Sequence, residues 1–127
     1  IDKPFVLTPM EFSVMERHSF ETYQILRHIP GMEMVAEWAA FHHETLNGRG
    51  YPFRHKAERL SLEARIVAVA DVFQALAQAR PYRKPQPVEV IPGILSLFVA
   101  KGALDPDVVG VASEDLQASW LAATQTL

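Results

Sequence analysis

Apolar positions recur at helical spacings along the chain, and breaker residues separate the segments that carry them. In the first segment Thr8, Pro9 and Glu11 form the pattern of a capping box, which predicts a helix that begins near Pro9. Pro30-Gly31 ends this segment. The next segment, 33–43, is apolar on much of its circumference and predicts a buried helix. Both patterns indicate helix rather than strand.

The longest periodic segment lies in the middle of the chain. Ser61 can cap a helix over 62–78, which is rich in Ala and Val and closes at Arg80-Pro81. Shorter helices are expected at 94–101, where Pro92 makes the start irregular, then from Asp105-Pro106, and finally over 114–124. No segment shows the alternation of a lone strand convincingly. The predicted fold class is therefore all-α, a compact multi-helix domain.

The stretch from about Glu44 to Leu60 lacks helical periodicity. It contains Gly48, Gly50 and Pro52 together with several charged residues. Long irregular connections are uncommon in compact domains and are often lids or binding loops. We therefore interpret this stretch as a long functional loop.

Composition limits the function classes. A chain of 127 residues with 49% apolar residues can build one core, so 1–127 is expected to be a single domain. The chain opens at Ile1 in a loop-like segment, and we expect it to be a piece truncated on its N-terminal side. Twelve basic against fifteen acidic residues, without runs of one sign, argue against a nucleic-acid polymer as partner.

Cysteine is absent, so any metal ligands must be His, Asp or Glu, and a reducing compartment fits the composition. The longest apolar run, 64–77, is interrupted by Arg65 and Asp71, and no membrane segment is expected. The expected location is cytoplasmic.

Metal chemistry is indicated by His42, His43 and Asp71. Adjacent positions on a helix lie roughly 100° apart, so two neighbouring imidazoles can reach neighbouring metals, or one metal and a substrate phosphate. Asp71 projects from an apolar segment, so its carboxylate must meet a cation, either an Arg or a metal, or else lie at a wet rim. Two alternatives stay open: one imidazole packs in the core while the other faces solvent, or Asp71 pairs with Arg65 or Arg80.

Other histidines and cations are less informative from spacing alone. His18 is compatible with an inward position on the first helix, whereas His28 and His55 are expected to be solvated. Arg80 and Arg83 could hold phosphate oxygens. Alternatively, these cations simply complement the dipole at the end of the central helix.

The ordered combination HHETLNGRGYP, LSLEARIVAVADVF, RPYRK and LDPDVV resembles the HD-GYP domain. This is the bacterial cyclic-di-GMP phosphodiesterase branch of the HD phosphohydrolase superfamily. The likeness spans nearly the whole chain, and the opening KPFVLTPMEFSVMERHSFETYQIL is similar to the segment that follows the His-Asp doublet in that family.

This resemblance implies an HD-type helical fold and a hydrolase of bacterial second-messenger signalling. Two or three divalent metals, often iron or manganese, would promote attack of water on the phosphodiester of cyclic-di-GMP, giving pGpG or GMP. A diguanylate cyclase (GGDEF) domain is an implied partner of the GYP loop. The positions that match family residues are His18, His42, His43 and Asp71 as metal ligands, Arg80 and Arg83 near substrate phosphate, and Gly50, Tyr51 and Pro52 as the GYP loop.

The chain also departs from the family pattern. The His-Asp doublet is absent, because the family places it shortly before the position of Ile1, and no catalytic residue is assigned here. Asn47, Gln74 and Ala79 stand where the family usually has Asp. A second interpretation is therefore a catalytically degenerate regulatory or protein-interaction module. A two-His, one-carboxylate oxygenase would use the same donors but suits an all-helical chain with adjacent histidines poorly.

Overall fold

The computed structural model describes residues 8–51, 53–81 and 83–125. Within these ranges the chain is helical, and no β-strand occurs, which confirms the predicted all-α class. The α-helices are α1 (Pro9–Leu26), α2 (Glu33–Phe41), α3 (Leu62–Ala77), α4 (Ile91–Ala100), α5 (Pro106–Glu114) and α6 (Leu116–Thr124), and the two 3₁₀-helices are η1 (Ala57–Arg59) and η2 (Val88–Val90).

Capping residues fix the starts of three helices as the sequence predicts. The Thr8 hydroxyl accepts from the Glu11 N–H at 3.2 Å, and the Glu11 carboxylate accepts from the Thr8 N–H at 2.7 Å. Ser61 caps α3. Asp105 caps α5. The helix predicted over 94–101 begins earlier, at Ile91, because Pro92 lies in its first turn, where a missing N–H costs no helical hydrogen bond.

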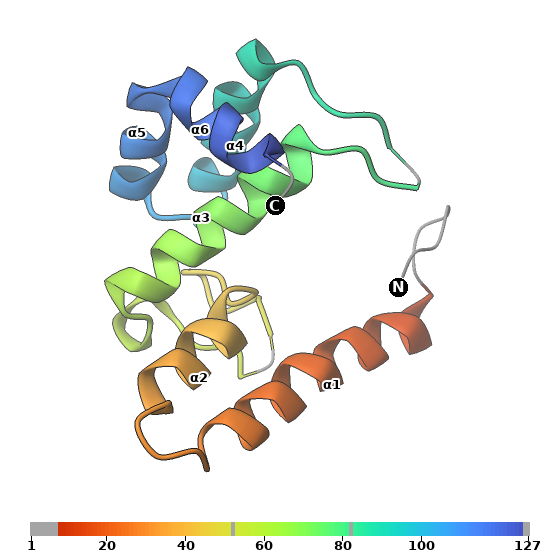
Figure 1. Cartoon of the computed structure of the whole chain (residues 1–127), viewed down its shortest axis with the longest axis vertical. Coiled ribbons are helices and arrows are strands. Elements are labelled where there is room, and N and C mark those ends of the chain that lie inside the picture. The colour runs from red at the N-terminus through yellow and green to blue at the C-terminus, as the bar shows by residue number, and fades with distance from the viewer. Residues whose placement is uncertain (1–7, 52, 82, 126–127) are drawn as a thin grey trace.

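Helix α3 crosses the middle of the molecule, with α1 and α2 on one side and α4, α5 and α6 on the other (Figure 1). Helix α2 packs against both α1 and α3, and α3 also contacts α4, α5 and α6. Helix α2 buries Ala36, Ala40 and Phe41, but Met34 is exposed, so the predicted burial holds for one face of this helix. None of the helices in the described ranges has the length and apolar character needed to cross a membrane.

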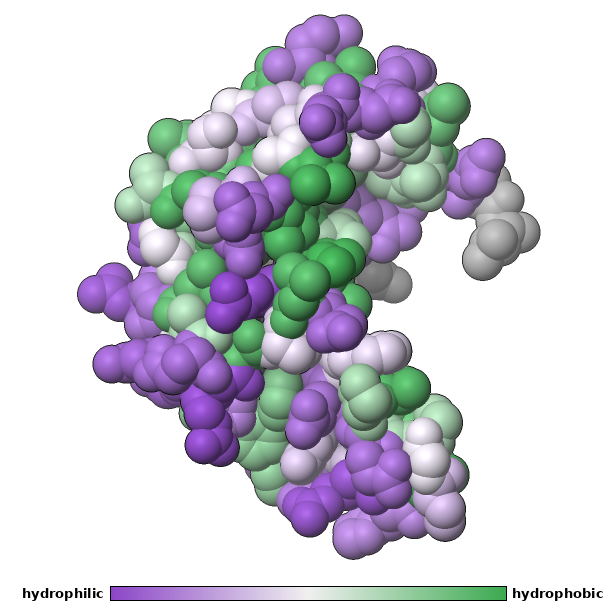
Figure 2. Space-filling view, turned by 90° about the vertical axis from the view of Figure 1, so that its left-hand side faces the viewer, coloured by the Kyte–Doolittle hydropathy of each residue, from purple (hydrophilic) through white to green (hydrophobic). Residues whose placement is uncertain are grey.

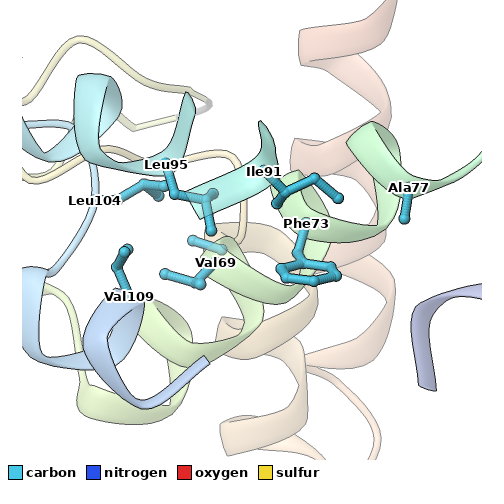
Figure 3. Close-up of a cluster of buried hydrophobic side chains, with 8 residues drawn as sticks. Val69, Phe73, Ala77, Ile91, Leu95, Leu104 and Val109 are labelled. Carbon is cyan, nitrogen blue, oxygen red and sulfur yellow. The ribbon is translucent and has the colours of Figure 1, made fainter. Parts of the chain in front are cut away.

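Two clusters of buried side chains hold these parts together. The larger one joins α3 to α4 and α5 (Figure 3). Its centre is formed by Val69 and Phe73 of α3 against Ile91 and Leu95 of α4, and both α4 residues are fully buried. The smaller one joins α2 to the start of α3 and consists of Ala40, Phe41, Leu60 and Ala64. Because α3 contributes to both clusters, it fixes the position of α2 relative to the rest of the fold.

Candidate metal centre

The structure brings together three of the predicted metal ligands, His42, His43 and Asp71. One donor atom from each lies within 4.8 Å of the others. His42 is the C-cap of α2 and His43 follows it, whereas Asp71 lies in the middle of α3. The site therefore depends on the packing of α2 against α3, which the smaller cluster holds in place.

The two imidazoles are adjacent and partly buried. Their ring centroids are 3.8 Å apart, and His43 Nδ1 lies 3.9 Å from an Asp71 carboxylate oxygen. His42 Nδ1 is 2.7 Å from the carbonyl oxygen of Ala39. When this nitrogen donates to the carbonyl, Nε2 keeps its lone pair, which is the tautomer that a metal ligand needs.

The electrostatic environment keeps His43 neutral. The pKa of His43 is lowered to about 4, chiefly by burial and also by the neighbouring His42, while the Asp71 carboxylate acts in the opposite direction. Only a neutral imidazole can bind a metal. His43 is therefore in its metal-binding form at neutral pH without having to lose a proton.

The GYP loop lies against this pair. The Tyr51 N–H donates to the His43 carbonyl at 3.2 Å, and the Tyr51 ring stacks on the His43 ring with centroids 4.7 Å apart. Burial raises the pKa of Tyr51 to about 12, with Asp71 and Glu16 adding to the effect, so the hydroxyl stays protonated at neutral pH. Pro52, the third residue of the predicted motif, lies outside the described residues.

Gly50 is required by its close approach to the backbone that carries the ligands. A Cβ at this position would lie 2.3 Å from the His43 carbonyl oxygen and 2.6 Å from both Glu44 Cα and the Thr45 nitrogen. Such distances cannot occur without a shift of the backbone. Glycine is therefore the residue that lets the loop fold onto the end of α2.

His18 is not brought to this cluster. Its side chain is 70% exposed, and Nδ1 lies 3.9 Å from a Glu21 carboxylate oxygen. The buried neighbour Ser19 shows which face of α1 packs inward, and His18 lies about 100° away from it around the helix. Its role as a further ligand stays a prediction that this arrangement of α1 does not support.

Arg80 and Arg83 lie beyond the end of α3, and the residues lining the cavity beside the metal cluster do not include them. Their backbones pair with each other, with N···O distances of 2.8 and 3.1 Å. The Arg80 side chain is exposed, while the Arg83 guanidinium donates to the Ala75 carbonyl near the end of α3. For Arg83 this matches the alternative of a cation that complements the helix C-terminus.

Of the two cations expected as rival partners of Asp71, Arg65 is engaged elsewhere. Arg65 donates to Asp105 at 3.1 Å and to the carbonyl oxygens of Leu60 and Ala57. This network ties α3 to the start of α5. Asp71 is left facing the two imidazoles, with a side chain that is 40% exposed.

One further expectation, for His55, changes with the structure. His55 is expected to be solvated, but it is half-buried and packs against the rings of Phe41 and Phe53, with centroids 5.1 and 5.3 Å away.

Asn47 uses both ends of its amide, since Nδ2 donates to the Lys101 carbonyl and Oδ1 accepts from Thr45 and Arg49. A carboxylate could not make the donor contact, which gives Asn47 a structural reason for departing from the family pattern.

A cavity of about 830 Å³ adjoins the cluster, and His42 and Asp71 form part of its wall. Most of the remaining wall is apolar and comes from α3, α5 and α6. Figure 2 views the side of the molecule that carries α5 and the start of α3, and hydrophobic side chains gather there at mid-height. Leu62, Ile66 and Val111, which line the cavity, are all exposed. The donor cluster therefore opens onto a large apolar hollow.

Two imidazole nitrogens and a carboxylate oxygen are donors that divalent transition metals accept. The neutral state of His43 and the hydrogen bond at His42 Nδ1 both favour metal binding by these residues. The residues present thus fit a metal centre, with His42, His43 and Asp71 as the groups that would hold the ion.

A comparison with protein families agrees with this fold. The model of the HD domain family matches residues 2–108, and the chain belongs to this family.

Curated relatives are longer proteins. The chain is 39% identical to 3'3'-cGAMP-specific phosphodiesterase 1 of Vibrio cholerae serotype O1 over 117 residues, 92% of this chain and 27% of the relative. It is 42% identical to a cyclic di-GMP phosphodiesterase of Thermotoga maritima over 89 residues, 68% of this chain and 24% of the relative. It is 41% identical to a cyclic di-GMP phosphodiesterase response regulator of Xanthomonas campestris pv. campestris over 107 residues, 82% of this chain and 28% of the relative. The chain thus spans about a quarter of their length.

Proposed function

We propose that this chain is part of a metal-dependent phosphodiesterase that hydrolyses a cyclic dinucleotide, cyclic-di-GMP first of all, to pGpG or GMP. The observation that carries the proposal is the convergence of His42, His43 and Asp71 at one point between α2 and α3. The names of the relatives supply the substrate class, because they are phosphodiesterases of cyclic di-GMP or 3'3'-cGAMP. The absence of cysteine fits a cytoplasmic enzyme, which is where we place it.

The metals would be two or three divalent ions, with iron or manganese as our first expectation. When bound, the metal would act as a Lewis acid toward a phosphoryl oxygen and would lower the pKa of its bound water toward neutrality. The chain itself holds His43 neutral and orients His42 through the Ala39 carbonyl. The exposed Arg80 remains our candidate for contact with substrate phosphate, and the cavity beside His42 and Asp71 has room for a ligand of nucleotide size.

The test uses the intact protein loaded with Mn²⁺ or Fe²⁺ and offers cyclic-di-GMP and 3'3'-cGAMP as substrates. We expect hydrolysis of at least one of them, and we expect Asp71→Asn to abolish both metal binding and hydrolysis. Asp107→Asn is the matched control, since Asp107 lines the same cavity but lies outside the donor cluster. A metal-loaded protein that hydrolyses neither substrate would overturn the proposal.

A second candidate function is a regulatory module that binds a diguanylate cyclase (GGDEF) domain through the GYP loop. The observation that favours it is the outward position of three loop cations, Arg49, Arg54 and Lys56, all of which are exposed. Tyr51 is half-buried against His43, so these cations offer more accessible contacts than the tyrosine. Partner binding should survive replacement of His42 and His43 but weaken in Arg54→Glu. Loss of binding in the histidine variants instead would contradict this role.

A further inference from the structure

Glu44, which directly follows the two histidines, is almost completely buried, with 2% of its surface exposed. Its carboxylate accepts two backbone hydrogen bonds from the far end of the GYP loop. Oε1 accepts from the Phe53 N–H at 2.6 Å, and Oε2 accepts from the His55 N–H at 3.0 Å. One side chain thus ties the end of α2 to residues nine and eleven positions later.

The backbone between these two N–H groups is shaped to receive an anion. Arg54 has a φ of +56°, in the left-handed region that non-glycine residues seldom adopt. This conformation points the flanking N–H groups toward the same side, as in the backbone concavities that bind anions. The unusual φ at Arg54 is therefore matched to the carboxylate that fills the concavity.

The near end of the loop is fastened to the same short segment. The Tyr51 N–H donates to the His43 carbonyl, and Gly50 packs directly on the backbone of His43, Glu44 and Thr45. Contacts before and after Tyr51 thus converge on His43 and Glu44. With the backbone held on both sides, the Tyr51 ring is placed beside the His43 ring.

The position of Tyr51 matters for the metal centre because of its contact with His43. The planes of the two rings are 26° apart, and His43 Nδ1 faces Asp71 at 3.9 Å. An imidazole stacked against a fixed ring cannot rotate freely about its Cβ–Cγ bond. The stack therefore holds His43 ready to bind before any metal arrives.

We propose that Glu44 is a positioning residue for the metal centre, which fixes the GYP loop so that Tyr51 orients His43. The effect on metal binding rests on the proposed function, whereas the effect on His43 itself does not. A carboxylate is the right group for this task, because it offers an acceptor to each of the two N–H groups. Glutamine has the same size, but its NH₂ group would face one of these N–H groups, donor against donor.

The experiment follows the ¹H and ¹³C signals of the His43 imidazole in the intact, metal-free protein, and in parallel measures Mn²⁺ affinity. Tyr51→Leu removes the stacked ring and supplies the reference position of the His43 signal. In Glu44→Gln we expect the signal of the folded protein to move toward that reference. We also expect Mn²⁺ affinity to fall about 10-fold or more, the size typical for residues that orient a metal ligand.

Asp105→Asn is the matched control for a merely structural effect. Asp105 is also a buried carboxylate that accepts two backbone N–H groups, from Asp107 and Val108, but it caps α5. Its replacement should lower the melting temperature without moving the His43 signal. A structural role for Glu44 would give the same result as this control.

Coupling between the two variants completes the test. If Glu44 acts through Tyr51, Glu44→Gln should change neither the His43 signal nor Mn²⁺ affinity when introduced into Tyr51→Leu. Additive effects, or an unchanged His43 signal in folded Glu44→Gln, would overturn the proposal.

Should Glu44→Gln fail to fold, Tyr51→Leu alone decides, because wild-type Mn²⁺ affinity in that variant contradicts the proposed chain of contacts. If the protein has no phosphodiesterase activity, the proposed function is refuted, and the His43 signal still tests whether Glu44 positions His43.

Discussion

The ring of Tyr51 stacks on the imidazole of His43, with the centroids 4.7 Å apart. The Tyr51 hydroxyl stays protonated at neutral pH, since burial raises its pKa to about 12. Tyr51 therefore contributes a neutral aromatic face to the centre rather than a charged ligand. This relationship joins the loop that gives the family branch its name to the histidine pair that would hold the metal.

The ring and the hydroxyl of Tyr51 can be separated by substitution. Tyr51→Phe keeps the stacked ring, and we expect its Mn²⁺ affinity to stay within about twofold of wild type, because an aromatic pair depends on the rings rather than on a substituent. A large loss in Tyr51→Phe, measured by isothermal titration calorimetry, would show that the hydroxyl takes part directly. Phe20→Leu serves as a control, since Phe20 contacts Phe53 rather than His43.

Gly50→Ala should damage the site through the backbone. Its new Cβ would collide with the His43 carbonyl oxygen at 2.3 Å, so the loop must move away from the end of α2. We expect a loss of unfolding free energy of about 1–3 kcal/mol, the usual cost of overpacking, together with weaker Mn²⁺ binding. Urea denaturation and calorimetry would measure the two effects.

Gly93→Ala is the matched control for this change, because a Cβ on Gly93 meets no atom within 4 Å and the residue lies within α4. It should be neutral or slightly stabilising, since alanine has the higher helix propensity. Equal behaviour of the two variants would mean that the close approach at Gly50 is not important.

The ion pair between the partly buried Arg65 and the buried Asp105 should matter for stability and not for chemistry. Although burial alone would raise the pKa of Asp105, the hydrogen bonds from Arg65, Val108 and Asp107 lower it below 3.8. Arg65→Met leaves that carboxylate without its cation, and we expect a loss of about 1–3 kcal/mol of unfolding free energy. The exposed Arg59→Met should change it by no more than about 0.5 kcal/mol. Chemical denaturation at pH 7 would measure the unfolding free energies of the two variants.

Local signals explain which parts of the fold the sequence predicts well. The capping residues Thr8, Ser61 and Asp105 act within three residues of themselves, so their patterns can be recognised without knowing the fold. The pairing of adjacent histidines with Asp71 was also predicted from donor chemistry and family resemblance. The structure brings these three groups together, while their function as ligands stays a prediction.

The contacts that the sequence does not predict lie within the long loop, where residues far apart along the loop come into contact. Glu44 reaches Phe53 and His55, and that contact depends on how these loop residues are brought back to the end of α2. No periodicity encodes such a path. The available hint was a carboxylate at the start of a long loop, where many backbone N–H groups need acceptors. His18 is the converse case, since a position that matches the family pattern lies on an exposed face of α1, and its role as a ligand stays a prediction.

The protonation of His43 gives the last prediction. Its pKa of about 4 in the folded protein lies below the ordinary value of 6.5, chiefly because burial disfavours the charged ring. Between these values the unfolded chain binds a proton that the folded chain does not, so the free energy of unfolding decreases as the pH falls. The stability contributed by His43 should be fully present above pH 6.5 and be lost as the pH drops toward 4. The pKa of Asp105 lies lower still, so its contribution is lost in a more acidic range.

Chemical denaturation of the metal-free protein across pH 4 to 7 would measure this slope, and His43→Gln should flatten it. The imidazole signal of His43 should show no titration near pH 6.5. A midpoint at that pH would mean that His43 is solvated in the folded protein. It would also remove the reason to regard this histidine as preset for a metal, because binding would then compete with a proton close to neutral pH.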